Sequence, residues 1–254
     1  MTSPAGGGPA LARLAGLLAD DTRARICLTL LDGRAWTVGE LARLAGVAPS
    51  TASEHVSRLV RGGLLTEQRQ GRHRYLRLAG PSVAQLIEDL AGYAPPPPPP
   101  VRSLRAARAD AALAYARTCY DHLAGRLGVR VRDAMLARRF LDDAAGPALT
   151  PAGPVLTPAG QEWLTALAVP LDAPRGRRPL VRDCLDWTER RPHLAGALAA
   201  GLLRRLYDLG WLVPGVGRAV RLTPAGRPAL AAALGLDPAD LAPPSVSDIG
   251  GGRA

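Results

Sequence analysis

Six consecutive prolines, Pro95–Pro100, are the feature that most restricts how this chain can fold. Proline has no backbone N–H to donate, and its ring clashes with the preceding helical turn, so the stretch is incompatible with a helix or a central strand. Such a run forms a short, stiff polyproline II spacer. We therefore predict a first domain over 1–94, a linker over 95–101 and a second domain over 102–242. The remaining residues, 243–254, are predicted to form a disordered tail.

The composition favours a mainly helical protein with a polyanionic partner. Hydrophobic residues make up 47% of the chain but aromatics only 4%, so the core must be built from leucine, alanine and valine, which favours helices. The formal net charge of +10 indicates nucleic acid as a partner. Three scattered cysteines are too few for a disulfide framework, and the sequence shows neither a signal peptide nor a membrane span. We expect a soluble cytoplasmic protein associated with the nucleoid.

Residues 10–94 carry the pattern of a winged helix-turn-helix. Thr37 and Glu40 form a predicted capping box at the start of one short helix. After a short turn, Pro49 opens a second helix, and two helices joined in this way are typical of a helix-turn-helix. The segments "LLTEQRQ" and "RYLRL" alternate in polarity and flank Gly71, which predicts a β-hairpin with arginines at its tip.

The stretch "VGELARLAGVAPSTASEHVSRLVRGGLLTEQRQGRHRYLRL" resembles the winged-helix domain of ArsR/SmtB-type bacterial repressors. The matching features are the paired helices, a serine at the start of the recognition helix, the exit "L-x-x-x-G-L-L" and the arginine-rich wing. The resemblance implies a dimeric repressor that an effector releases from DNA. It also implies that the first and closing helices form the dimer interface, through Leu11, Leu14, Leu86 and Leu90.

The resemblance and the local charge point to one DNA-binding surface. Short hydroxyl side chains at a helix N-terminus can enter a major groove, and arginines on a wing suit phosphates or a minor groove. A dimer implies a pseudo-palindromic operator in double-stranded DNA, with half-sites about one helical turn apart. The alternative is an ordinary capped helix with solvated arginines. The predicted DNA-binding residues are Ser50, Thr51, Ser53, His55, Arg58, Arg69, Arg72, His73 and Arg74.

The inducer sites usual in this family cannot be carried over to this chain. Many members have a Cys-x-Cys pair in the helix before the recognition helix, and the corresponding stretch "WTVGELARLAG" has no cysteine. Others place aspartate and histidine pairs on the closing helix, and the stretch "VAQLIEDLAGY" has no histidine. Cys27 lies in an apolar helix and is predicted to be a small buried packing residue.

The second domain contains an internal duplication. "HLAGRLGVRVRDAMLARRFL" from His122 aligns without gaps with "HLAGALAAGLLRRLYDLGWL" from His193, and each is followed by "LTPAG". Each copy predicts a helix, strand-like residues and a second helix capped by threonine. The predicted fold class is mainly α with small β-hairpin wings, an N-terminal winged helix-turn-helix followed by two winged-helix-like repeats. The repeats lack the hydroxyl cluster, so we do not expect them to bind DNA.

Each repeat also carries one cysteine and one histidine near its start. The spacing of three would place Cys119 and His122 on one helical face, and Cys184 lies nine residues before His193. If the repeats pack symmetrically, the four residues could converge as a Cys₂His₂ set for zinc or another transition metal, or bind haem iron. The alternative is that the cysteines are buried packing residues and the histidines cap or bridge helices.

A sensor without a metal is a further possibility. An apolar pocket between the repeats could hold a small anionic or aromatic effector. An architectural DNA-binding protein without any effector is the third reading, and no enzyme is expected because the sequence has neither a phosphate-binding loop nor a nucleophile elbow. The residues of the candidate effector pocket are Trp163, Trp187, Arg190, Arg191 and Trp211.

Overall fold

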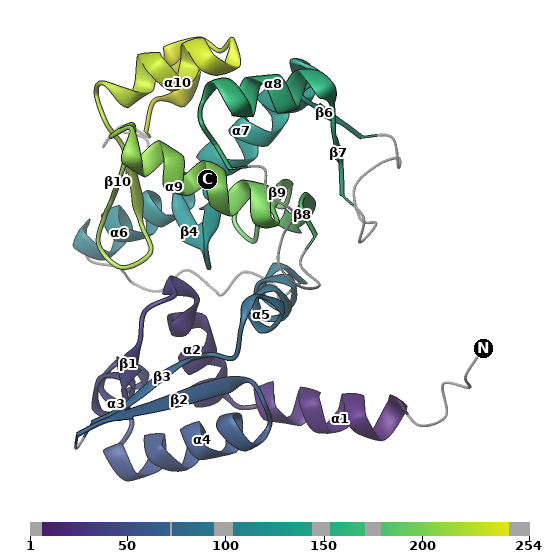
Figure 1. Ribbon diagram of the computed structural model, residues 1–254. Coiled ribbons are helices and arrows are strands. Elements are labelled where there is room, and N and C mark those ends of the chain that lie inside the picture. Colours follow the sequence, from purple (N-terminus) through teal and green to yellow (C-terminus); the bar gives the residue numbers. More distant parts are fainter. Residues whose placement is uncertain (1–6, 72, 94–103, 144–152, 171–178, 244–254) are drawn as a thin grey trace, which may run out of the picture. The chain divides into compact units, whose positions relative to one another are not determined.

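The structure is a computed structural model, and its contacts divide the chain into two compact units, Met1–Ile87 and Glu88–Ala254 (Figure 1). The boundary falls inside helix α5 (Pro81–Tyr93), whereas the predicted domain boundary follows residue 94 and stays a prediction. The polyproline run and nearly all of the predicted tail lie outside the described residues. Within the described part, none of the helices combines the length and apolarity needed to span a membrane. The structure describes residues 7–71, 73–93, 104–143, 153–170 and 179–243.

The first unit is a winged helix-turn-helix, as predicted. Helices α3 and α4 form the helix-turn-helix, and the hairpin β2–β3 forms the wing. A short strand that the sequence pattern did not predict, β1, pairs with β3 to give an antiparallel sheet in the order β1-β3-β2. The elements of the first unit are α1 (Gly7–Leu18), α2 (Asp21–Thr29), η2 (Leu30–Asp32), β1 (Trp36–Thr37), α3 (Val38–Ala45), α4 (Pro49–Arg61), β2 (Leu65–Gln70), β3 (His73–Leu78) and the first part of α5.

Local sequence signals explain where the helices of this unit begin and end. The capping box is present: Glu40 N–H donates to the Thr37 hydroxyl at 3.3 Å, and Thr37 N–H donates to the Glu40 carboxylate at 2.8 Å. Gly46, in the left-handed region at φ 72°, ends α3, and Pro49 occupies the first turn of α4. The apolar faces of these helices are fully buried, which fixes the orientation of α4 on the domain.

The second unit repeats one order of elements, hairpin–helix–hairpin–helix. The duplication predicts the last three of these elements, whereas the leading hairpin is not predicted. The unit also contains α6 (Leu104–Tyr115) and η3 (Pro238–Leu241). The first copy consists of β4 (Arg117–Cys119), β5 (His122–Ala124), α7 (Gly125–Ala137), β6 (Leu141–Asp142), β7 (Val155–Leu156) and α8 (Pro158–Ala166). The second copy consists of β8 (Arg182–Leu185), β9 (Pro192–Ala195), α9 (Ala197–Asp208), β10 (Leu212–Pro214), β11 (Val220–Leu222) and α10 (Gly226–Leu234).

The two copies share one hydrophobic core. Buried leucines from both, among them Leu127 and Leu164 of the first copy and Leu198 and Leu206 of the second, belong to a single cluster. Burial of this kind contributes about 1.5–3 kcal/mol for each large apolar side chain. The shared core holds the leading hairpins of the two copies side by side.

The structure corrects one expectation about the leading segments. The pattern suggested that Cys119 and His122 lie on one helical face, but both belong to the hairpin β4–β5. Tyr120, at φ 57° in the left-handed region, allows the two-residue turn between the strands. Gly125, at φ 80°, then turns the chain into α7, and a Cβ atom there would lie only 2.8 Å from the carbonyl oxygen of Ala114. The "HLAG" motifs therefore begin as strands and not as helices.

Candidate metal centre and DNA-binding surface

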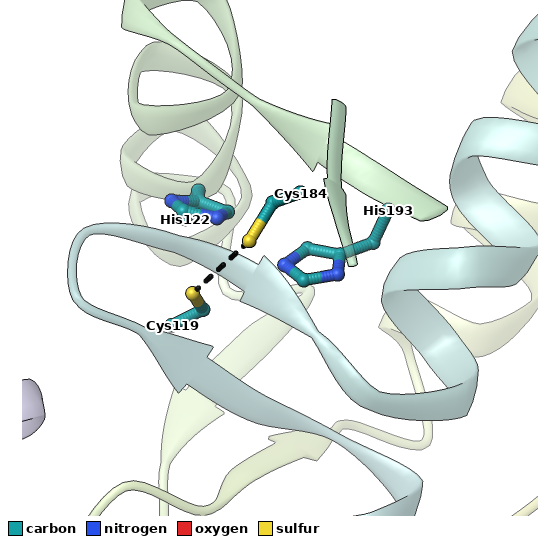
Figure 2. A group of neighbouring side chains, drawn as sticks. All are labelled: Cys119, His122, Cys184 and His193. Atoms are coloured by element: carbon teal, nitrogen blue, oxygen red, sulfur yellow. Dashed lines mark hydrogen bonds between the residues drawn. The ribbon is translucent and has the colours of Figure 1, made fainter. Parts of the chain in front are cut away.

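Two hairpins, one from each repeat, bring four potential metal ligands together: Cys119, His122, Cys184 and His193 (Figure 2). In each hairpin the cysteine and the histidine are direct cross-strand partners, so their side chains share one face. All four residues are buried, and one ligand atom of each lies within 4.8 Å of the other three. Each repeat thus supplies one sulfur and one imidazole to a common point.

The separation of the two sulfurs matches a tetrahedral metal site. The Sγ atoms of Cys119 and Cys184 are 3.8 Å apart, and the two residues are not joined by a disulfide. Two zinc–sulfur bonds of about 2.3 Å at a tetrahedral angle span about 3.8 Å. A disulfide would need about 2.05 Å. The imidazoles of His122 and His193 stack on each other with ring centroids 5.2 Å apart, beside the sulfurs.

The imidazole nitrogens have an unusual lack of partners. His122 Nε2 and both ring nitrogens of His193 are buried without a hydrogen bond to any described residue. A buried polar atom in that state costs roughly 1–3 kcal/mol, and native structures contain few of them. These nitrogens can serve as metal ligands, and they fit the donor set.

An aspartate stands beside the Nδ1 atom of each histidine. Asp121 Oδ1 lies 3.4 Å from His122 Nδ1, and Asp186 Oδ2 lies 3.6 Å from His193 Nδ1. In a neutral imidazole, a carboxylate in this position favours the tautomer that carries its proton on Nδ1, so the Nε2 lone pair can bind a metal once the Nε2 proton is lost.

The two buried sulfurs share one hydrogen bond, so the loss of a proton from one depends on the other. Burial and this hydrogen bond raise the pKa of one thiol of the pair, while the hydrogen bond and the nearby His193 lower the pKa of the other. Burial alone would lower the pKa of His122, but Asp121 and the sulfur of Cys184 outweigh it and raise that pKa to about 9. The pair therefore favours one thiolate, the form that binds metals.

Asp186 is held in place by a buried network that sequence reasoning missed. Arg117 Nη2 donates to Asp186 Oδ2 at 2.9 Å, and neither side chain is exposed to solvent. The amide of Gly125 and the hydroxyl of Thr188 also donate to the carboxylate, both at 2.6 Å. Burial alone would raise the pKa of Asp186, but Arg117 and His193 outweigh it and lower that pKa to about 2. The carboxylate therefore remains charged behind His193.

The leading end of α4 is open, as a recognition helix requires. Ser50 and Thr51 are exposed, and Ser53 is half-buried on the following turn. Arg58, further along the helix, is exposed and pairs with Glu54 at 2.6 Å. Small hydroxyl side chains at this end leave room for a DNA groove.

The wing presents some of its predicted residues to solvent and uses others internally. Arg69 has 79% of its side chain exposed, and His73 is exposed as well, whereas Arg72 lies outside the described residues. Arg74 donates to Glu67 at 2.5 Å and to the hydroxyl of Ser57 on α4 at 3.3 Å. Arg74 thus braces the wing against the recognition helix.

His55 is turned away from the open end of α4. Its Nδ1 lies 3.6 Å from Asp20 Oδ1 and 3.5 Å from Arg23 Nη1, at the start of α2. This position supports contact between helices, and a role of His55 in choosing DNA bases stays a prediction.

The side chains of the candidate effector pocket are held by separate partners. Trp163 stacks on Phe140 with centroids 5.0 Å apart, and Arg117 lies over the ring of Trp187 at 4.7 Å. Trp211 packs on the shared core, and both arginines of the set are exposed. An effector pocket at Trp163, Trp187, Arg190, Arg191 and Trp211 therefore stays a prediction.

The remaining predictions concern apolar residues. Of the leucines expected at a dimer interface, Leu11 and Leu90 are exposed, at 67% and 47%, while Leu14 and Leu86 are half-buried. Cys27 is fully buried, and burial raises the pKa of its thiol to about 12, which agrees with a packing role.

Comparison with known proteins places the first unit among DNA-binding domains. Residues 18–68 match the family described as a helix-turn-helix domain. The uncharacterized HTH-type transcriptional regulator YdfF of Bacillus subtilis is 38% identical over 222 residues, which cover 86% of this chain and 94% of YdfF. The HTH-type transcriptional regulator CmtR of Mycobacterium tuberculosis is 41% identical over 81 residues, 32% of this chain and 68% of CmtR.

Solved structures are similar over the same share of the chain. The cadmium metal-sensor CmtR of M. tuberculosis is 34% identical and covers 36% of this chain and 97% of its own, with a TM-score of 0.29. A homodimeric winged helix-turn-helix domain from Mycobacterium bovis, a possible ArsR-family regulator, is 31% identical. The match covers 34% of this chain and 80% of that domain, with a TM-score of 0.32.

The fold and the relatives define a winged helix-turn-helix DNA-binding protein and not an enzyme. The expected resemblance to ArsR/SmtB-type regulators is confirmed at the level of the regulator family. The chain belongs to the family of HTH-type transcriptional regulators.

Proposed function

We propose that this protein is a cytoplasmic metal-responsive repressor whose winged helix binds operator DNA as a homodimer. A zinc-like divalent ion, bound by Cys119, His122, Cys184 and His193, is its effector. The observation that supports the proposal is the convergence of four buried ligand atoms within 4.8 Å. Within the described residues, three of the four nitrogens of the two imidazoles have no hydrogen-bond partner. The relative CmtR, described as a cadmium sensor, supports a metal as the effector.

The donor set selects the kind of ion. Two thiolates and two neutral imidazoles suit a tetrahedral ion such as Zn²⁺ or Cd²⁺, and the two thiolates balance its charge. Haem iron takes one or two axial ligands from a protein, so it would leave at least two of these four donors unused. Four protein donors also leave no open position for a substrate, which favours sensing over catalysis.

The proposal is tested with the full chain freed of metal by a chelator. Zn²⁺ is titrated against a competing chromophoric chelator, and Co²⁺ serves as a spectroscopic probe of the coordination geometry. DNA affinity is measured by fluorescence anisotropy on a duplex selected from random sequences by the protein itself. We expect one ion per chain, a tetrahedral cobalt spectrum with thiolate charge-transfer absorption, and a loss of DNA affinity of about tenfold or more on Zn²⁺ binding.

Matched cysteine variants make the test specific. Cys184→Ser should lose the metal response while the affinity of the metal-free protein for DNA stays unchanged. Cys27→Ala, in the other unit, should retain both the ion and the response. A protein that takes up no Zn²⁺, or that binds one ion with unchanged DNA affinity, would contradict the proposed function.

A further inference from the structure

We infer that the metal centre acts on the winged helix through the last turns of α5, residues 88–93, which are fastened to both ligand-bearing hairpins. This inference rests on the proposed metal-sensing function and adds the route by which the site would control DNA binding. The family's own inducer positions on α5 are not used; the helix serves as a connector to a centre built elsewhere.

The first fastening joins α5 to the strand that carries Cys119. Glu88 is buried, with 1% exposure, and accepts a hydrogen bond from Arg218 Nη1 at 3.0 Å. The backbone carbonyl of Arg218 in turn accepts from the amide of Thr118, at 2.8 Å, next to Cys119 on β4. Among the described residues, Arg218 is the cation that pairs with buried Glu88, and loss of this pair would strongly destabilise the carboxylate. A displacement of Arg218 is therefore expected to move Glu88.

The second fastening joins α5 to the hairpin that carries Cys184. Asp89 Oδ2 lies 3.9 Å from Arg182 Nη2, and Arg182 is two residues before Cys184 on β8. The carbonyl of Gly92 accepts a hydrogen bond from Arg190 in the β8–β9 loop. A Cβ atom at Gly92 would lie 3.1 Å from Leu185, the residue after Cys184, so the helix backbone lies directly against this hairpin.

Metal binding would draw together the four ligand atoms that these two hairpins carry. The ligand atoms are now up to 4.8 Å apart. In a tetrahedral Zn²⁺ site they would be about 3.3–3.8 Å apart. The C-terminal end of α5 is attached to both hairpins. A displacement of the hairpins on metal binding would therefore displace this end of the helix as well.

The helix continues without a break into the first unit. Pro81–Ile87 are counted with the winged helix, and the residues from Glu88 onward with the metal-binding unit. Because α5 is one continuous helix, a displacement of its C-terminal end would be transmitted to the DNA-binding unit through the backbone of the helix. The ion needs only to favour one arrangement of this helix over another.

The experiment compares the metal response of DNA binding in the wild type and in full-length variants of the fastenings. The measured quantity is the ratio of DNA dissociation constants with and without Zn²⁺, determined by anisotropy on the selected duplex. We expect Glu88→Gln to bind one Zn²⁺ and to bind DNA normally when metal-free, while the ratio falls from about tenfold to below about twofold. Arg218→Gln should lower the ratio in the same way, and the double variant should lower it no further than either single variant. Glu162→Gln, on the exposed face of α8, is the matched control and should keep the wild-type ratio.

The outcomes separate the two proposals. A wild-type ratio in Glu88→Gln and in Arg218→Gln would overturn the α5 route and leave the metal-sensing function standing. A ratio of one in the wild type itself would overturn both. Should Glu88→Gln fail to fold by circular dichroism, Asp89→Asn tests the second fastening, because Asp89 is 41% exposed and its loss is tolerable. We expect Asp89→Asn to reduce the ratio, and an unchanged ratio in a folded Asp89→Asn protein would overturn the route.

Discussion

Arg117 of the first repeat and Asp186 of the second form a fully buried ion pair beside His193, one of the four candidate metal ligands. The pair links the repeats and holds the carboxylate 3.6 Å from His193 Nδ1. Desolvation of two charges is costly, so such a pair is retained for what it positions more than for net stability. Here it fixes the orientation of a potential metal ligand.

Asp186→Asn should therefore affect both stability and metal binding. The substitution leaves Arg117 as a buried charge without a counter-ion, which should lower the free energy of unfolding by about 3 kcal/mol. Loss of the carboxylate beside His193 should weaken Zn²⁺ binding about 10–100-fold. Urea denaturation of metal-free protein and competition titration measure the two effects. Asp133→Asn, which breaks the exposed pair with Arg191, is the control and should cost less than about 1 kcal/mol.

The two described arginines of the wing should respond differently to truncation. Arg69 is 79% exposed and makes only a long ion pair with Glu67, at 4.0 Å, so its guanidinium can reach phosphate. Arg69→Ala should therefore weaken binding to all duplexes and reduce the slope of log K against log salt by about 0.9. Arg74→Ala should weaken DNA binding by releasing the wing from Ser57, with a smaller change in slope. Anisotropy titrations at several salt concentrations separate the two. Equal slopes for Arg69→Ala and wild type would contradict the assignment of the wing to DNA.

The start of the recognition helix should determine sequence preference. Ser50→Ala and Thr51→Ala remove exposed hydroxyl groups without disturbing buried contacts. We expect the affinity for the selected duplex to fall while non-specific binding changes little, because base contacts specify and phosphate contacts position. Thr66→Ala, exposed on β2, is a suitable control. The measurement is the ratio of affinities for the selected duplex and for a scrambled one.

The capping box of α3 should stabilise the first unit in a pH-dependent way. Hydrogen bonds from the Thr37 amide and hydroxyl hold the pKa of Glu40 below its usual range. A lowered folded pKa means that the carboxylate stabilises the fold above the unfolded pKa of about 4.3, and that this contribution is lost as the pH falls through the folded value. Thr37→Ala should lower the free energy of unfolding by about 1 kcal/mol at pH 7.

The pH dependence of the capping box can be isolated with a second variant. Glu40→Gln removes the charge, so the difference in unfolding free energy between wild type and this variant should shrink between pH 7 and pH 3. Urea denaturation at both pH values provides the measurement. A difference that stays constant with pH would show that Glu40 stabilises the helix without its charge.

Much of the architecture could be predicted because it follows local signals. The capping box at Thr37, the turn after Gly46 and the paired "LTPAG" caps at Thr157 and Thr223 are each formed by residues a few positions apart. The duplication and its cysteine–histidine pairs were visible in the same way, because an aligned repeat places equivalent residues in equivalent positions.

The features that sequence reasoning missed depend on contacts distant along the chain. The pattern of three between Cys119 and His122 is compatible with a helix or a hairpin, and the left-handed Tyr120 decides between them. Asp186 and Arg117 come from different repeats, so no local pattern pairs them. The neighbour of His55, Asp20, likewise comes from the packing of α2 against α4 and from no local pattern, while the role of His55 in DNA binding stays a prediction.

The division of the four donors between two tandem hairpins sets how the protein would respond to its ion. A chain with a single repeat would supply only two of the four ligands and would need a second molecule to complete the coordination sphere. Its affinity for the ion would then depend on the protein concentration. Covalent fusion of the two copies turns that encounter into an intramolecular event. The affinity of one chain for its ion is then the same at any concentration of the regulator.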